Sequence, residues 1–265
     1  MSRPLTDAPP RREVVISRRQ AAVCAGLAYA VLNVLALFAN FFVLTRLTVP
    51  DDAAATVRNI TGSELLFRGG IAAFVVVLML DVVVAWGLYV LFQRTSRELS
   101  LFAAWFRLVY VAIAAAALLH LLLAVRLADA AGYTTALEKG QRDAQVMLSL
   151  DAYAYGWRIG LVAFGVHLLL LGLVLARSAD APRLFGVLVP LAGLGYVVMM
   201  LAGLLMPDFE ERKGLFLSLL AVVAVPAEFG LAIWLLWRGG RGDPAARRLP
   251  RWPLLSRVQD GPAGR

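Results

Sequence analysis

The chain has 265 residues, of which 60% are hydrophobic and only 17% are charged. A soluble domain contains about 45–50% apolar and about 25% charged residues, so this composition excludes an ordinary soluble globular protein. The net charge of +8 does not indicate a nucleic-acid partner, because no soluble domain carries a basic stretch interleaved with aromatic residues. Cys24 is the one cysteine, which excludes an intrachain disulfide and a cysteine-based metal cluster.

The apolar residues gather in six blocks of about 20 residues, the length that a helix needs to cross ~30 Å of hydrocarbon. The blocks run over residues 20–45, 69–92, 100–125, 154–176, 184–206 and 214–237. We therefore predict an all-α fold, a polytopic transmembrane bundle of six helices.

Polar segments flank this transmembrane domain, which we place at residues 20–237. Residues 1–19 contain three prolines and are predicted to form a flexible tail, because a chain end without packing partners stays mobile. Residues 238–265 are rich in Arg, Gly and Pro, a composition typical of disorder. Most of the 26 basic residues fall in the segments on the same side as both ends, so the positive-inside rule predicts that both termini are cytoplasmic.

The first and third connections between the predicted spans, both on the outer side of the membrane, have helical sequence patterns. Pro50-Asp51-Asp52 precedes three alanines, which places a carboxylate cap before strong helix formers. The connection 127–153 has helical composition around Thr135–Ser149. We predict short outer-face helices in both connections; they are either binding elements or connectors without a function.

Three charged residues are the candidates for an outer-face site: Asp52, Glu64 and Arg68. Glu64 and Arg68 are four residues apart at the start of the second span. This spacing also fits a surface ion pair on a helix, which contributes only about 0.2–0.5 kcal/mol.

Ionisable residues inside membrane helices cost roughly 2.5–3.5 kcal/mol each and therefore need a partner or a function. Asp81 and Arg107 lie about 16 and 11 Å from the inner boundary at ~1.5 Å per residue, so neighbouring antiparallel helices can form an ion pair between them. Glu228 is at a similar depth and competes for the same arginine. Together with His167, these residues form a candidate buried polar cluster, either a packing clamp or a site for protons, a cation or a polar headgroup.

The second histidine in the apolar blocks, His120, lies nearer the outer end of its helix than His167 does. Because this difference in depth disfavours a bis-histidine haem or a shared metal, we predict no cofactor and no metal. Enzyme signatures such as Gly-x-Ser-x-Gly and His-Glu-x-x-His are missing from the sequence.

These observations favour a non-enzymatic membrane protein, either a small permease or an accessory or sensory subunit. An intramembrane enzyme acting on a lipid or quinone is one alternative. A scaffold that binds a partner through its outer connections is another. The candidate partners are the lipid bilayer and a second membrane protein, with no nucleic acid; the sequence does not indicate an oligomeric state.

A short pattern occurs twice in the apolar blocks. Ala25–Tyr29 reads AGLAY and Ala192–Tyr196 reads AGLGY. In each case the next apolar block contains one carboxylate, Asp81 or Glu228. A parallel duplication of a group of helices produces such a repeat, and chance produces it as well in helices rich in Ala, Gly and Leu.

The sequence also resembles a known family in several segments: Asp52–Thr56, Asn59-Ile60, Glu64–Arg68, Leu101–Val109, Ile159–His167, Pro182–Leu188, Ala192–Tyr196 and Ala227-Glu228. Over about residues 18–238 these segments resemble the bacterial membrane family called domain of unknown function 4386. The resemblance implies a six-helix protein of the bacterial inner membrane and no particular activity. Asp81, Arg107, His167 and Glu228 fall on positions that the family pattern also fills with polar residues.

Overall fold

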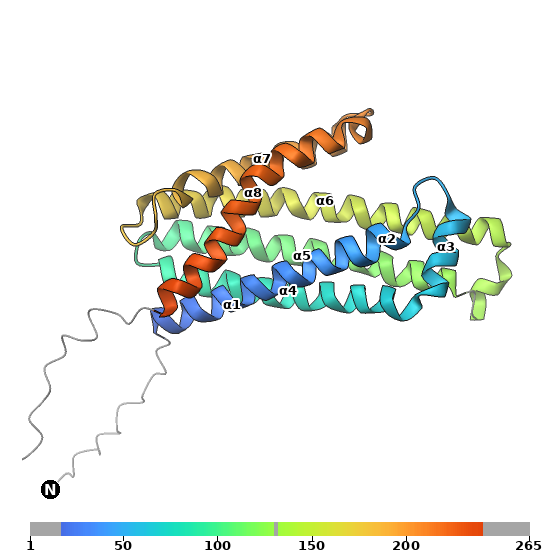
Figure 1. Cartoon of the computed structure of the whole chain (residues 1–265), viewed down its shortest axis with the longest axis horizontal. Helices are drawn as coiled ribbons and strands as arrows, with labels where there is room; N and C mark the ends of the chain where they lie inside the picture. The colour runs from blue at the N-terminus through green and yellow to red at the C-terminus, as the bar shows by residue number, and fades with distance from the viewer. Residues whose placement is uncertain (1–16, 130–131, 241–265) are drawn as a thin grey trace, which may run out of the picture.

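The computed structural model describes residues 17–129 and 132–240. Most of the two predicted tails, residues 1–16 and 241–265, therefore lies outside the described residues. The described part is helical and contains no strand, and six of its helices are long and apolar enough to cross a membrane (Figure 1). The prediction of an all-α, six-span, multi-pass membrane protein is confirmed.

The first span contains a wider, π-helical segment near its end. It consists of α1 (Arg18–Leu37), the π-helix η1 (Phe38–Leu44) and α2 (Thr45–Leu47). Ser17 and Gln20 form a capping box at its start. Inside η1, the Asn40 side chain donates a hydrogen bond to the Ala36 carbonyl at 2.9 Å. The Asn40 amide thus uses a backbone carbonyl as its acceptor in the region where the helix widens, a rare feature of helices.

The next three helices are α3 (Ala53–Gly62), α4 (Glu64–Phe92) and α5 (Arg97–Ala128). An Asp52 carboxylate oxygen accepts a hydrogen bond from the Ala55 backbone N–H at 2.8 Å, so α3 starts at the cap that the sequence predicts. That α3 faces the outside of the cell stays a prediction. The second span is longer than predicted, because α4 begins at Glu64 directly after α3.

The remaining elements are the 3-10 helix η2 (Gly132–Ala136), α6 (Lys139–Arg177), α7 (Phe185–Leu205) and α8 (Phe209–Gly240). The separate short helix expected around Thr135–Ser149 is wrong in its extent, because α6 runs without a break from Lys139. No proline occurs between Lys139 and Arg177 to interrupt it, and the Lys139–Asp143 ion pair at 2.7 Å joins two successive turns of α6.

The six spans form a closed ring. Along the chain each span packs against the next, in the order α1, α4, α5, α6, α7 and α8, and α8 then packs against α1. At this closure a side chain on Gly26 would lie 2.9 Å from the Leu236 backbone nitrogen, so glycine permits the close approach. Arg19 donates a hydrogen bond to the Gly239 carbonyl at 2.8 Å, and the described chain therefore starts and ends at the same end of the bundle (Figure 1).

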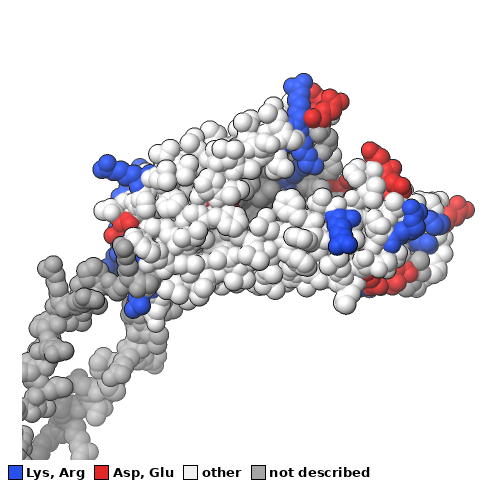
Figure 2. Space-filling view, viewed as in Figure 1, with Lys and Arg blue, Asp and Glu red and all other residues white. Residues whose placement is uncertain are grey.

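α8 bends part-way along its length (Figure 1), and its two halves differ in burial. Five hydrophobic residues from Ala227 to Leu235 are buried, whereas only three from Phe209 to Pro226 are. Pro226 lies at this change, and proline removes a backbone hydrogen bond from a helix and kinks it. The N-terminal half of α8 thus diverges from α1, and Figure 2 shows the surface hollowed on this face.

The lateral surface of the ring suits a lipid environment. In Figure 2 the charged side chains gather toward the two ends of the bundle, and the surface between them is largely uncharged. Large apolar side chains such as Phe41, Leu119 and Val222 are more than half exposed. In water such a surface would be unfavourable, whereas a bilayer provides an apolar solvent for it.

Candidate functional site

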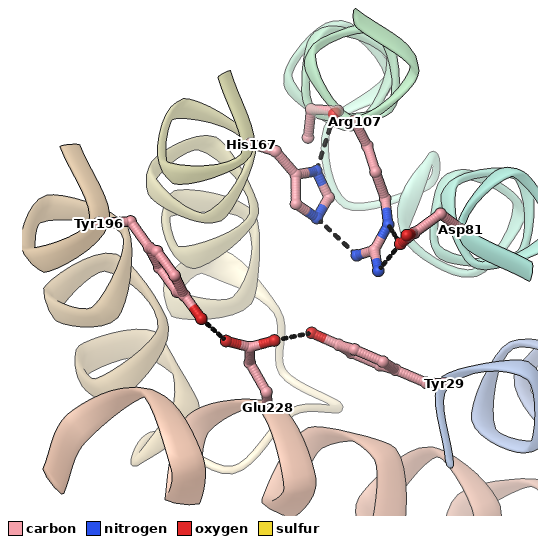
Figure 3. Close-up of polar contacts among 7 residues, drawn as sticks. Tyr29, Asp81, Arg107, His167, Tyr196 and Glu228 are labelled. Carbon is pink, nitrogen blue, oxygen red and sulfur yellow. Dashed lines mark hydrogen bonds and ion pairs between the residues drawn. The ribbon is translucent and has the colours of Figure 1, made fainter. Parts of the chain in front are cut away.

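Each of the six spans contributes one polar side chain to a network inside the ring (Figure 3). In chain order these residues are Tyr29, Asp81, Arg107, His167, Tyr196 and Glu228. Because the helices form a closed ring, inward-facing residues at a similar depth meet near its axis. The network has two parts, which face one another in Figure 3.

The first part is a buried ion pair between α4 and α5. Arg107 donates from Nε and Nη2 to the same Asp81 carboxylate oxygen, at 2.9 and 2.5 Å. The exposed fractions of the Arg107 and Asp81 side chains are 0% and 3%. Charged hydrogen bonds of this kind are strong, and breaking such a pair leaves an uncompensated buried charge.

Two aromatic rings complete the surroundings of the Arg107 guanidinium. Its central carbon lies 4.9 Å from the centre of the Tyr29 ring and 5.3 Å from that of the Phe164 ring. The faces of aromatic rings attract cations, most strongly where water is excluded. These contacts connect α1 and α6 to the ion pair.

His167 joins the same part of the network through both ring nitrogens. Arg107 Nη1 lies 3.1 Å from Nε2, and the Ala103 carbonyl oxygen lies 2.8 Å from Nδ1. Arginine can only donate and a carbonyl can only accept. The imidazole is therefore neutral and carries its proton on Nδ1, with both ring nitrogens engaged.

A small cavity beside His167 gives no sign of a nucleophile–base pair. Its volume is about 10 Å³, and Ser100 and His167 are among its lining residues. The space suffices for about one water molecule. The Ser100 hydroxyl has no hydrogen-bond partner among the described residues, and both His167 nitrogens are engaged elsewhere, so the histidine is not positioned to activate the serine.

The second part of the network surrounds Glu228 on α8. Tyr196 donates to one carboxylate oxygen at 2.8 Å, and Tyr29 donates to the other at 3.5 Å. Glu228 forms no ion pair with Arg107, whose donors are directed at Asp81 and His167. The expected competition for the arginine is therefore not seen. Both Glu228 and Tyr196 are partly exposed.

The formal charges of the network do not balance when both carboxylates are ionised. Asp81 and Glu228 contribute two negative charges, Arg107 contributes one positive charge, and His167 is neutral. One added proton or one bound cation would neutralise the network. A net charge in the middle of a membrane is costly, so the added positive charge is favourable.

The structure thus brings three of the four predicted cluster residues, Asp81, Arg107 and His167, into direct contact. Glu228 is linked to them through Tyr29, whose ring contacts Arg107 and whose hydroxyl reaches Glu228. That the cluster has a function stays a prediction.

The two tyrosines of the network are not among the residues singled out from the sequence. Tyr29 and Tyr196 end the AGLAY and AGLGY segments, so the repeated pattern is the signal that could have pointed to them. Both hydroxyls reach the same carboxylate, that of Glu228.

The outer-face candidates do not form a common site. Asp52 caps α3 through the Ala55 N–H. Glu64 and Arg68 pair with each other at 2.5 Å, with side chains 40% and 48% exposed. His120 also lies apart from the polar network, because it lines a mostly apolar groove of about 540 Å³ formed by α5, η2 and α6.

The family model described as "Domain of unknown function (DUF4386)" matches residues 24–239. The chain belongs to this family. The match includes all six residues of the polar network, and the family's description gives no activity. An uncharacterized protein of the archaeon Archaeoglobus fulgidus is 30% identical over 128 residues, which are 48% of this chain and 63% of that protein. The chain thus covers less than two thirds of this relative. No solved structure matches the chain.

Proposed function

We propose that the protein is a small, non-enzymatic membrane permease whose exchangeable group is the Glu228 carboxylate. The observation that carries the proposal is the difference between the two carboxylates of the network. Asp81 accepts two hydrogen bonds from a buried guanidinium, whereas Glu228 is held by two neutral hydroxyls and is partly exposed. An ionisable group of this kind inside a membrane marks a candidate ion or proton pathway.

In this proposal the two parts of the network have different tasks. The Asp81–Arg107–His167 part holds α4, α5 and α6 together through buried polar contacts. Glu228 takes up a proton or a cation, which neutralises the network, and releases it on the other side. Pro226 lies inside α8, two residues before Glu228. α8 bends part-way along its length (Figure 1), and a movement at this bend would change access to the carboxylate.

Specific observations count against the two alternative functions. An enzyme that used His167 as a base would need a free ring nitrogen, and both are engaged. A scaffold would favour an apolar or strongly acidic outer surface. On the face drawn in Figure 2, basic and acidic residues are instead mixed at the end of the bundle that carries α3.

Flux measurements on proteoliposomes test the permease proposal. The vesicles enclose a pH dye, and a potassium diffusion potential draws cations inward. We expect the wild-type protein to accelerate proton entry, Glu228→Gln to abolish the acceleration, and Glu98→Gln, a change of an exposed carboxylate at the start of α5, to leave it intact. Equal fluxes for wild type, Glu228→Gln and protein-free vesicles would contradict proton movement through Glu228.

We also infer that the protein lies in a bacterial inner membrane with both termini in the cytoplasm. The support is the excess of basic residues in the segments on that side. With Cys24 replaced by serine, Ser96→Cys should react with an impermeant thiol reagent only in inverted vesicles. Thr61→Cys on α3 should react in intact spheroplasts, and the reverse pattern would contradict this orientation.

A further inference from the structure

We infer that the cation bound by Glu228 is the ammonium end of an amphiphile, which reaches the carboxylate from the lipid through the hollow between α1 and the N-terminal half of α8. This inference rests on the proposed function and specifies its substrate class. It follows from the hydrogen-bonding capacity of the site, an unpartnered amide on α1, and the nature of the surface around the hollow.

The carboxylate of Glu228 has unused capacity to accept hydrogen bonds. A carboxylate offers about four lone-pair positions, and two are used by Tyr196 and Tyr29. A primary ammonium has three donors and one positive charge. It can therefore occupy the remaining positions and also supply the charge that neutralises the network.

Asn33 provides a second polar group on α1. Only 9% of the residue is exposed, and within the described part of the chain its amide nitrogen has no hydrogen-bond partner. Leaving a buried polar group unpaired is costly, so this amide favours a ligand that can bond to it. Its nitrogen and oxygen can exchange places by a flip of the side chain, and the oxygen would then accept from an ammonium.

The register of α1 and α8 places Asn33 close to the level of Glu228. Gly26 is in close contact with Leu236, and the two helices run in opposite directions because the start of α1 meets the end of α8 there. Asn33 is seven residues beyond Gly26, and Phe229 is seven residues before Leu236. Both steps are two turns, about 10.5 Å, so Asn33 lies opposite the residue next to Glu228 along α8.

The way to this site is apolar. The hollow lies on a face where Figure 2 draws mainly uncharged residues. Val34 and Leu37 on α1, and Val222 and Val225 on the N-terminal half of α8, are exposed large apolar residues. A strongly hydrated small cation would have to shed its water against such side chains, whereas an amphiphile keeps its apolar tail in lipid while its head binds.

Binding of two amines to the protein in phosphatidylcholine nanodiscs tests the inference. Dodecylammonium carries a long tail, and propylammonium carries the same head with only a short one. We expect saturable binding of dodecylammonium to wild type above the lipid background, weakened about tenfold or more by Glu228→Gln through loss of a charged partner. Asn33→Leu should also weaken it, Glu98→Gln should not, and propylammonium should bind far more weakly.

The outcomes separate failure of the inference from failure of the proposed function. Equal affinity for the two amines would overturn entry from lipid. No amine binding together with proton flux that depends on Glu228 would overturn the substrate class and leave the permease intact. The absence of both binding and flux would overturn both proposals.

A labelling experiment keeps the test valid if the variants do not fold. A dodecylammonium analogue with a photoreactive group on its tail should label peptides from α1 and α8 in the wild-type protein, and unlabelled dodecylammonium should compete. Labelling confined to other helices, or labelling without competition, would contradict the inference.

Discussion

The two carboxylates of the polar network should differ in their response to the same chemical change. Asp81→Asn removes the charge that balances Arg107, which is fully buried. Removing one partner of a buried ion pair costs about 3–5 kcal/mol, because the other charge stays unpaired. Glu228→Gln leaves no such orphan, because its amide oxygen can still accept from Tyr196, and its effect on the free energy of unfolding should stay within about 1 kcal/mol.

Unfolding in mixed micelles, followed by tryptophan fluorescence, measures this difference. The two variants are matched, since each replaces a carboxylate by an amide of the same shape. Combining Asp81→Asn with Arg107→Met removes both charges, and the double variant should be more stable than Asp81→Asn alone. Equal destabilisation by Asp81→Asn and Glu228→Gln would refute the assignment of a structural task to one carboxylate and a binding task to the other.

Three further changes test the fold with the same stability assay or with distance measurements. A Cβ on Gly193 would lie 2.6 Å from the Gly165 carbonyl oxygen, so Gly193→Ala should lower the free energy of unfolding by about 1–3 kcal/mol. Gly69→Ala is the control, because the space around Gly69 is open, and it should be neutral or stabilising. Equal losses of stability in the two variants would contradict the α6–α7 packing. Asp180 pairs with two arginines but is 43% exposed, so Asp180→Ala should cost no more than about 1 kcal/mol, and a larger loss would show that the pairing is more buried. Pro226→Ala restores a backbone donor to α8 and should therefore straighten it. Spin labels on α1 and on the N-terminal half of α8 should then move closer together. An unchanged distance would mean that another contact causes the bend.

The number and type of the helices could be predicted from the sequence, because a membrane span needs a long apolar run. Their bounds could not, because polar residues continue a helix beyond the apolar run, as Lys139 does at the start of α6. The contact of α8 with α1 closes the ring through residues as distant in the chain as Gly26 and Leu236, and hydropathy has no information about such contacts.

The candidate site was predictable to a similar degree. Depth along the helices placed Asp81 and Arg107 about 5 Å apart, a difference that an arginine side chain can span, and the expected ion pair is present. Depth does not specify how a helix is rotated about its axis, and it therefore left the partner of Glu228 open. Tyr29 and Tyr196 could not be assigned as partners, because a tyrosine in an apolar helix is compatible with simple packing.

Infrared difference spectroscopy of the lipid-reconstituted protein tests the central claim most directly, namely that Glu228 is the exchangeable group. A pH jump is applied to wild type, Glu228→Gln and Glu98→Gln. We predict a carboxyl band from an apolar environment that changes with pH in wild type and in Glu98→Gln and is missing from Glu228→Gln. The same band in Glu228→Gln, or none in wild type, would contradict the account.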